Sequence, residues 1–176
     1  MFCQPVTTPI IKPVNGRCNL SCSYCYTSGL GECAGRNRMR PEILRAVIDF
    51  FCRDQDDIEF IWHGGEPLLA GIEFYREAVE FQSAWKRQGK EMVNFLQTNA
   101  TLITTEWTRF FSENDFLIGV SLDGPKELHD QARCYSIGKG SYDDVMRGIE
   151  LLRQAEIFNG IICGVSATNH EFPGEI

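Results

Sequence analysis

Short apolar runs alternate along the chain with segments of helical periodicity. Apolar runs of about four to eight residues predict strands, and apolar residues three and four positions apart predict amphipathic helices. The expected strands are Thr8–Val14 (or the lead-in to a strand), Ile58–Trp62, Val93–Thr98, Phe116–Leu122 and Asn159–Ala167. The expected helices are Pro41–Cys52, Phe74–Trp85, Thr105–Phe111 and Ser141–Ala155. This alternation predicts consecutive βα units that form a parallel α/β sheet.

Two of the helices begin with recognisable signals. Pro41 suits a first helical turn, where its missing N–H would have no partner in any case. Ser141 and Asp144 have the spacing of a capping box, which predicts the start of the last helix.

The residues that follow each expected strand predict one common site. Both an open doubly wound sheet and an arc of a barrel gather their ligands at the carboxyl ends of parallel strands. Those positions are Cys18–Cys25, His63–Glu66, Gln97–Asn99, Ser121–Asp123 and Ser166–Asn169. All five sets are polar or able to bind metal, which favours an enzyme whose single site is built from successive strand ends.

Composition and charge exclude several classes of protein. The chain has 176 residues, enough for one domain (1–176), and its 43% hydrophobic and 23% charged residues exclude wholesale disorder. A formal net charge of −7 disfavours nucleic acid and anionic membranes as partners. Neither a signal peptide nor a membrane span is visible, so we expect a cytoplasmic protein with reduced thiols.

The strongest local signal is the cysteine loop, in which Cys18, Cys22 and Cys25 have the spacing C-x-x-x-C-x-x-C. Thiolates select zinc, copper(I) or iron–sulfur clusters. A structural zinc normally has four protein ligands, and the fourth is missing locally. A cubane held by three thiolates would keep one iron open for chemistry. A zinc knuckle completed by Cys33 or His63 is the alternative.

The other cysteines do not form a second short-spaced cluster. They are Cys3, Cys33, Cys52, Cys134 and Cys163. Cys52 and Cys163 lie in apolar surroundings, and we expect both to pack as small hydrophobic residues.

The cysteine loop, with Tyr24 just before its last cysteine, resembles the signature of the radical S-adenosylmethionine (SAM) superfamily. Four further blocks resemble, in order, those of anaerobic sulfatase-maturating enzymes and of peptide maturases with a SPASM extension. They are HGGEPLLAG at 63–71, LQTN at 96–99, SLDGP at 121–125, and LHD at 128–130 followed by Arg133. The resemblance runs from about Ile11 to the end of the chain.

This resemblance implies an oxidoreductase that carries a [4Fe-4S] cluster on Cys18, Cys22 and Cys25 and binds SAM at the open iron. Reductive cleavage of SAM would give a 5′-deoxyadenosyl radical that oxidatively modifies a peptide or protein side chain. The implied partners are that substrate and an external one-electron donor of the flavodoxin or ferredoxin type.

The superfamily core has six βα units, so the resemblance implies a partial (β/α) TIM-type barrel, truncated before the sixth strand and without the SPASM-like extension. A truncated, non-catalytic homologue that binds a cluster or peptide is therefore the second hypothesis. A zinc-stabilised binding module is the third.

The resemblance also implies roles for individual residues. Gly64, Gly65 and Glu66 would receive the amino group of SAM, with the Glu66 carboxylate as acceptor for the ammonium. Tyr24 would lie near the adenine, and Ser121 and Arg133 would contact the ribose or carboxylate of SAM. Weaker candidates for the site are Gln97 and Asn99, and Asp123 and Gly124 are expected only to form a turn.

The histidines give less information about function than these motifs do. Sulfatase-maturating enzymes typically carry glutamine where this chain has His63, and histidine there is more typical of maturases that crosslink or modify ribosomal peptides. His129 and His170 have no independent argument for catalysis. No catalytic acid or base is assigned.

Overall fold

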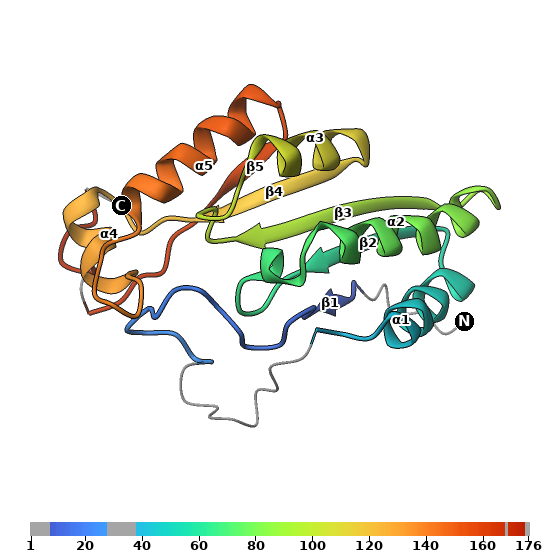
Figure 1. The fold of residues 1–176 in the computed structure, drawn as a ribbon, viewed down its shortest axis with the longest axis horizontal. Helices are drawn as coiled ribbons and strands as arrows, with labels where there is room; N and C mark the ends of the chain where they lie inside the picture. The colour runs from blue at the N-terminus through green and yellow to red at the C-terminus, as the bar shows by residue number, and fades with distance from the viewer. Residues whose placement is uncertain (1–7, 28–37, 168, 175–176) are drawn as a thin grey trace.

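Five parallel strands form one sheet whose spatial order follows the chain, β1-β2-β3-β4-β5 (Figure 1). The computed structural model describes residues 8–27, 38–167 and 169–174. The strands are β1 (Ile10–Ile11), β2 (Asp57–Trp62), β3 (Glu91–Thr98), β4 (Phe116–Ser121) and β5 (Phe158–Ile162). A doubly wound sheet reverses its strand order at a switch point, whereas a barrel does not. The order therefore confirms the α/β fold and identifies the sheet as an arc of a barrel.

The helices connect successive strands. They are α1 (Pro41–Asp54), α2 (Ile72–Lys86), α3 (Thr105–Glu113), α4 (Lys126–Ala132) and α5 (Tyr142–Gln154), with a short 3-10 helix η2 (Pro67–Ala70). Each of the four expected helices is present, within two residues at either end. Both α4 and η2 were missed, because seven and four residues are too short to show a helical period. No helix within the described ranges is long and apolar enough to cross a membrane.

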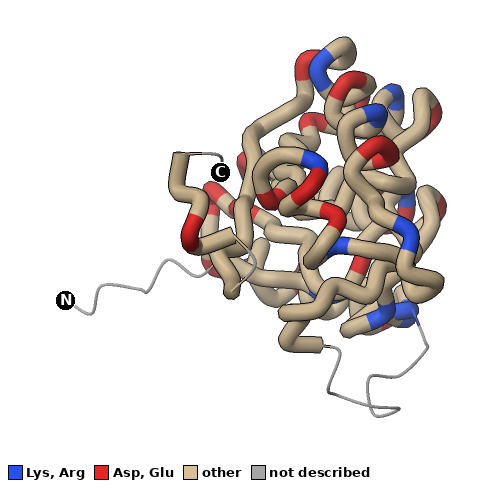
Figure 2. The backbone as a smooth tube through the Cα atoms, turned by 90° about the vertical axis from the view of Figure 1, so that its left-hand side faces the viewer, with Lys and Arg blue, Asp and Glu red and all other residues tan. Residues whose placement is uncertain are grey.

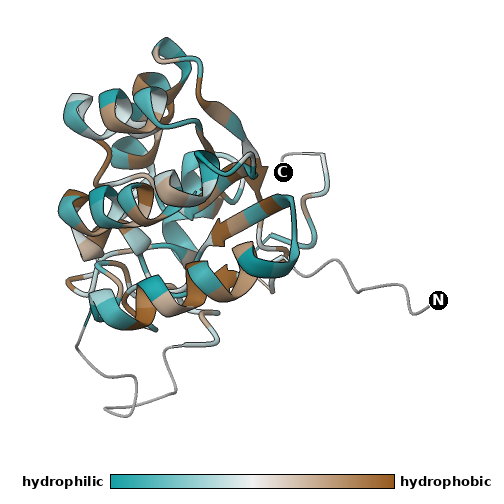
Figure 3. Cartoon of the chain, turned by 90° about the vertical axis from the view of Figure 1, so that its right-hand side faces the viewer, coloured by the Kyte–Doolittle hydropathy of each residue, from teal (hydrophilic) through white to brown (hydrophobic). Residues whose placement is uncertain are grey.

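The core lies between the sheet and the helices. Along β3, alternate residues from Met92 to Thr98 are buried, and the residues between them are exposed or half-buried. The helices in view carry both hydrophilic and hydrophobic residues (Figure 3). Fully buried aromatic side chains dominate this layer: Trp62, Tyr75, Phe60, Phe74, Phe111 and Phe116. One face of the sheet is thus closed by packing, while the other remains available for a site.

The capping box expected at the start of α5 is wrong. Ser141 makes no side-chain cap, and its hydroxyl donates instead to the carbonyl of Arg133 at 2.7 Å. The N–H of Tyr142 is capped by Asp130 Oδ1 at 2.9 Å. A remote carboxylate therefore replaces the local one expected from Asp144, and this contact joins α4 to α5.

Candidate metal and cofactor site

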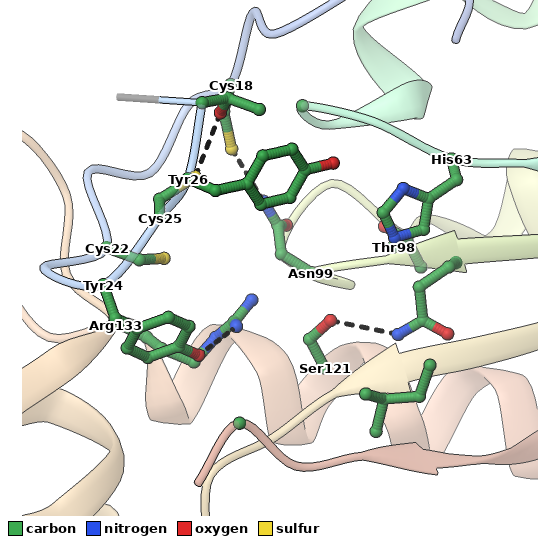
Figure 4. A pocket seen from close by; sticks show the side chains of 15 residues that line it. Cys18, Cys22, Tyr24, Cys25, Tyr26, His63, Thr98, Asn99, Ser121 and Arg133 are labelled. Carbon is green, nitrogen blue, oxygen red and sulfur yellow. Dashed lines mark hydrogen bonds between the residues drawn. The ribbon is translucent and has the colours of Figure 1, made fainter. Parts of the chain in front are cut away.

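A pocket of about 280 Å³ lies at the carboxyl ends of the strands, where the sequence predicts it (Figure 4). All five strand ends contribute to its lining: Cys18, Cys22, Tyr24, Cys25, Tyr26 and Thr27 after β1, His63 and Gly65 after β2, Gln97, Thr98 and Asn99 of and after β3, Ser121 of β4, and Ile162 and Gly164 of and after β5. Arg133 completes it from the end of α4. The fifth set differs from the expectation, because β5 ends at Ile162 and the described residues Ser166, Ala167 and Asn169 do not line the pocket. Thr168 lies outside the described residues.

The three cysteines of the loop all line this pocket and are half-buried. Backbone hydrogen bonds hold the loop against the end of α4: the N–H of Ser21 donates to the carbonyl of Cys134 at 2.7 Å, and that of Ser23 to Ala132 at 2.9 Å. The loop that carries the thiols is therefore fixed by a distant segment as well as by its own turn.

Burial is the largest cause that raises the pKa of the Cys22 thiol to about 11; Arg133 opposes the shift, and the neighbouring Cys18 and Cys25 thiols add to it. Burial likewise raises the pKa of Cys18. A cationic metal centre would reverse this effect and favour the thiolates. Across the described ranges, no three His, Cys, Asp or Glu side chains are gathered closely enough to hold one metal ion. The three thiols therefore line one pocket, but they do not form a single-ion site with other described residues.

Glu66 is buried beneath the site instead of lining it. Its carboxylate accepts hydrogen bonds from the N–H of Leu68 at 3.0 Å, the hydroxyl of Thr98 at 2.8 Å and the N–H of Asn99 at 2.8 Å. Complete burial raises the pKa of this carboxyl, while those hydrogen bonds act to lower it. The role of ammonium acceptor that the resemblance implies for this carboxylate stays a prediction; in the structure its two oxygens accept three hydrogen bonds from the protein.

Asn99 connects this buried carboxylate to the cysteine loop. Its Nδ2 donates to Asn19 Oδ1 at 2.9 Å and lies 3.6 Å from the sulfur of Cys18 (Figure 4). The N–H of Leu20 also points at that sulfur, at 3.4 Å. Two N–H donors on one sulfur would stabilise a thiolate at Cys18.

The two glycines after β2 allow this turn to pack against the cysteine loop. Gly64 and Gly65 have φ of +90° and +56°, and a Cβ on Gly65 would lie 2.1 Å from the carbonyl oxygen of Arg17. The N–H of Glu66 donates to that same oxygen at 2.8 Å. Gly65 lines the pocket, whereas Gly64 does not.

Arg133 and Tyr24 form a polar wall on the opposite side. Arg133 is 9% exposed; its Nη1 donates to Tyr24 Oη at 2.8 Å, and its Nε is buried with no hydrogen-bond partner. The Tyr24 hydroxyl donates to Asp123, which also accepts the N–H of Gly164 at 2.8 Å. The positive charge of the Arg133 guanidinium in the pocket lining suits an anionic ligand.

Ser121 lies between these two walls, on β4. Its hydroxyl accepts a hydrogen bond from Gln97 Nε2 at 3.0 Å. A Cβ on Gly119 would come within 2.3 Å of Gln97 Oε1, so this glycine makes room for the Gln97 side chain. Both polar groups therefore face the pocket from neighbouring strands.

A sequence comparison decides the family: the model of the radical SAM superfamily matches residues 13–173. This chain belongs to the radical SAM superfamily. It is 40% identical over 98% of its length to the serine-type anaerobic sulfatase-maturating enzyme of Bacteroides thetaiotaomicron, and 37% identical over 93% to the cysteine-type enzyme of Clostridium perfringens. It covers 42% and 45% of those proteins, so it spans less than half of their length.

Solved structures give the same relationship. This radical SAM chain is similar to hexahistidine-tagged anSMEcpe with bound AdoMet, with a TM-score of 0.88 and 36% identity over 95% of this chain and 46% of that one. Native anSMEcpe with bound AdoMet and Cp18Cys peptide gives a TM-score of 0.87 and 34% identity, over 96% and 46%. The resemblance stated from the motifs is confirmed.

The histidines of this radical SAM chain have separate environments. His63 lines the pocket, where burial and the nearby charge of Lys12 lower its pKa. His129 is fully buried in α4: its Nδ1 accepts the N–H of Asp123 at 3.3 Å, and its Nε2 lies 3.0 Å from Ser141 Oγ. His170 is exposed. His129 thus holds together the segments that carry Asp123 and Arg133.

Asp123 and Asn99 take a larger part in the site than their motifs predict. Asp123, expected only in a turn, is buried and joins the cysteine loop to the end of β5 through Tyr24 and Gly164. The position of both residues at strand ends is the sequence feature that could have identified them as site residues.

The remaining cysteines have different environments. Cys52 is buried as expected, but Cys163 is only half-buried, because it follows the edge strand β5. Cys3 and Cys33 lie outside the described residues.

Proposed function

We propose that this chain forms the cluster-binding and SAM-binding part of a radical SAM enzyme that oxidatively modifies a peptide or protein side chain. The observation that carries the proposal is the set of three pocket-lining thiols after β1, in a fold similar to an AdoMet-bound sulfatase-maturating enzyme. A bound [4Fe-4S] cluster and SAM together supply the 5′-deoxyadenosyl radical that removes a hydrogen atom from the substrate.

The chain's own residues bind and orient these groups. The thiolates of Cys18, Cys22 and Cys25 would hold three irons, and the N–H groups of Leu20 and Asn99 would stabilise the charge on Cys18. Glu66 acts by fixing the end of β3, and thereby the Asn99 side chain, in place.

The rest of the pocket suits SAM. The Arg133 guanidinium offers a positive charge to the carboxylate of SAM, and Ser121 offers a hydroxyl to a polar group such as the ribose. Gly65 lets the backbone approach the ligand closely, since it carries no side chain. Tyr24 would pack near the adenine while its hydroxyl holds Arg133.

The proposed substrate is a peptide or protein side chain. The relatives act in sulfatase maturation by name, in serine-type and cysteine-type forms, and anSMEcpe has been solved with a bound peptide. His63 supports a second candidate function, a maturase of a ribosomal precursor peptide. It lines the pocket, and sulfatase-maturating enzymes typically carry glutamine at this position.

A one-electron donor of the flavodoxin or ferredoxin type would reduce the cluster. We place the protein in the cytoplasm, where thiols stay reduced.

Anaerobic reconstitution with iron and sulfide tests the cluster. We expect a brown protein with charge-transfer absorption, lost in Cys22→Ala. Cys134→Ala is the matched control, because this half-buried cysteine adjoins the loop but does not line the pocket. A colourless protein with stoichiometric zinc would overturn the proposal in favour of a zinc module.

Incubation with SAM and dithionite then tests turnover. We expect 5′-deoxyadenosine from the reconstituted chain and none from Cys22→Ala. An intact cluster without 5′-deoxyadenosine would instead identify a homologue that binds without catalysis.

A further inference from the structure

Charge is distributed very unevenly along this acidic chain. Residues 1–45 contain six Lys and Arg and two Asp and Glu, a formal charge of +4. Residues 46–176 contain eleven basic and twenty-two acidic residues, a formal charge of −11. The basic part is also the part that carries the cysteine loop.

Four basic residues of this part lie on two adjacent segments, one after β1 and one before α1, and we term them the basic edge: Lys12, Arg17, Arg38 and Arg40. All four are exposed. The N–H of Met39 donates to the carbonyl of Pro13 at 2.7 Å, which holds the segment before α1 against the segment after β1. Figure 2 shows Lys and Arg segments gathered at the lower right, where the described chain resumes before α1.

An ion pair joins the basic edge to helix α2. Arg38 lies 4.0 Å from Glu77 of α2. Within residues 8–27 and 38–45, Glu42 is the only acidic residue. By sequence count, residues 8–27 and 38–45 therefore carry five basic residues and one acidic residue, on a chain that is acidic overall.

The basic edge borders the pocket directly. Lys12 Nζ lies 3.4 Å from Tyr26 Oη and 5.3 Å from the centre of its ring, and Tyr26 lines the pocket while remaining 67% exposed. The Lys12 stem lies against Gly64, where a Cβ would come within 2.6 Å of it. Arg17 immediately precedes Cys18.

We propose that the basic edge is the docking surface for an acidic one-electron carrier protein that reduces the cluster; this inference rests on the proposed function. The carrier loses one electron and the [4Fe-4S] centre gains it, with no bond made or broken and no proton transferred. Opposite charges on two proteins accelerate their encounter and fix their orientation.

A carrier fits this surface better than the peptide substrate does. A substrate must bring its reacting carbon into the pocket, whereas an electron only needs a short path to the cluster. The basic edge lies outside the pocket, beside the cysteine loop, and so satisfies the second requirement. The test below includes the substrate as an outcome.

The experiment uses a flavodoxin of net negative charge as the probe. Its affinity for the full chain is measured by titration, and its rate of cluster reduction by stopped flow, at about 0.05 M and 0.3 M salt. Lys12→Glu/Arg40→Glu is the test variant. Arg109→Glu is the control, because Arg109 is exposed on α3 and does not line the pocket. Dithionite, which needs no docking surface, reduces each protein in parallel.

We expect the double variant to lose about tenfold or more in affinity and in reduction rate at low salt, and the loss to shrink at high salt as screening increases. Arg109→Glu should behave as wild type, and dithionite should reduce all three proteins equally. Flavodoxin rates that are insensitive to salt and to the double variant, with normal reduction by dithionite, would overturn the docking surface and leave the proposed function intact.

Two other results would also overturn it. A double variant that loses peptide modification under dithionite but binds flavodoxin normally would assign the basic edge to the substrate. A wild-type chain that assembles no cluster would refute the proposed function and this inference together, whatever its affinity for flavodoxin.

Discussion

The carboxylate of Glu66 accepts the backbone N–H of Asn99 at 2.8 Å, and the side-chain amide of Asn99 lies 3.6 Å from the sulfur of Cys18. Strands β2 and β3 are thereby coupled to the cysteine loop through one buried anion. The Gly-Gly-Glu-Pro turn is thus part of the support beneath the candidate cluster site as well as of the pocket wall.

Glu66→Gln should be strongly destabilising. The carboxylate of Glu66 accepts hydrogen bonds from Leu68, Thr98 and Asn99. The NH₂ group of glutamine would face at least one of these donors, so two buried donors would lie opposite each other without an acceptor. We expect a loss of about 1–3 kcal/mol in the free energy of unfolding, measured by urea denaturation. Glu59→Gln, an exposed position on β2, is the control. Equal stability of the two variants would contradict the network.

Gly65→Ala should displace the cysteine loop. Its Cβ would lie 2.1 Å from the carbonyl oxygen of Arg17, which precedes Cys18. We expect lower stability and a several-fold lower iron content after reconstitution. Gly89→Ala has positive φ, +88°, but no atom within 4 Å of its added Cβ. Gly89→Ala therefore separates the effect of the steric clash with Arg17 from the effect of backbone strain. An equal iron content in both variants would show that the close contact between Gly65 and Arg17 is unimportant.

Arg133→Lys should weaken SAM binding while keeping a positive charge. Lysine lacks the planar guanidinium that contacts Tyr24 and presents the buried Nε. We expect about a tenfold or larger rise in the Kd for SAM, measured on the reconstituted chain. Arg153→Lys, at the outer end of α5, is the control. An unchanged Kd in Arg133→Lys would remove this residue from the binding site.

Stability should fall in mild acid because of His129. Burial and the charge of Arg133 lower its pKa below the ordinary value of 6.5, so below that value the unfolded chain binds a proton more readily than the folded one. Protonation at Nδ1 would also break the hydrogen bond from Asp123 N–H. The free energy of unfolding should therefore be insensitive to this group at pH 7.5 and decline toward pH 5.

Urea unfolding at pH 7.5 and 5.5 measures this effect. His129→Gln should reduce the decline without abolishing it, because the pKa of His63 is lowered as well. The exposed His170→Gln should leave the decline unchanged. A His129→Gln chain with the same pH dependence as wild type would refute the assignment.

Much of the fold was predictable because the chain's periodicities are strong. The apolar alternation of β2 and β3 and the stripe from Phe74 to Trp85 mark their elements directly. The barrel arc could not be separated from a doubly wound sheet by periodicity, since both give the same alternation. The capping of α5 was mispredicted because Asp130 is eleven residues away from Ser141 in sequence and adjacent only in the fold.

The candidate site was predictable where short-range spacing carries the chemistry, as in Cys18, Cys22 and Cys25. It was not predictable where long-range packing decides what a side chain does. Nothing local shows that Glu66 points inward to Asn99, or that the hydroxyl of Tyr24 bonds to Asp123 at the wall of the pocket. Those contacts arise only when separate strand ends are brought together.

Electron paramagnetic resonance of the reduced, reconstituted chain, with and without SAM, tests the central claim most directly. We predict about four irons and four sulfides per chain, a reduced-cluster signal, and a clear change in its g-values when SAM is added, because the ligand would occupy the iron that the three thiolates leave open. A signal that SAM does not alter would show that no iron is open to it and would contradict the account.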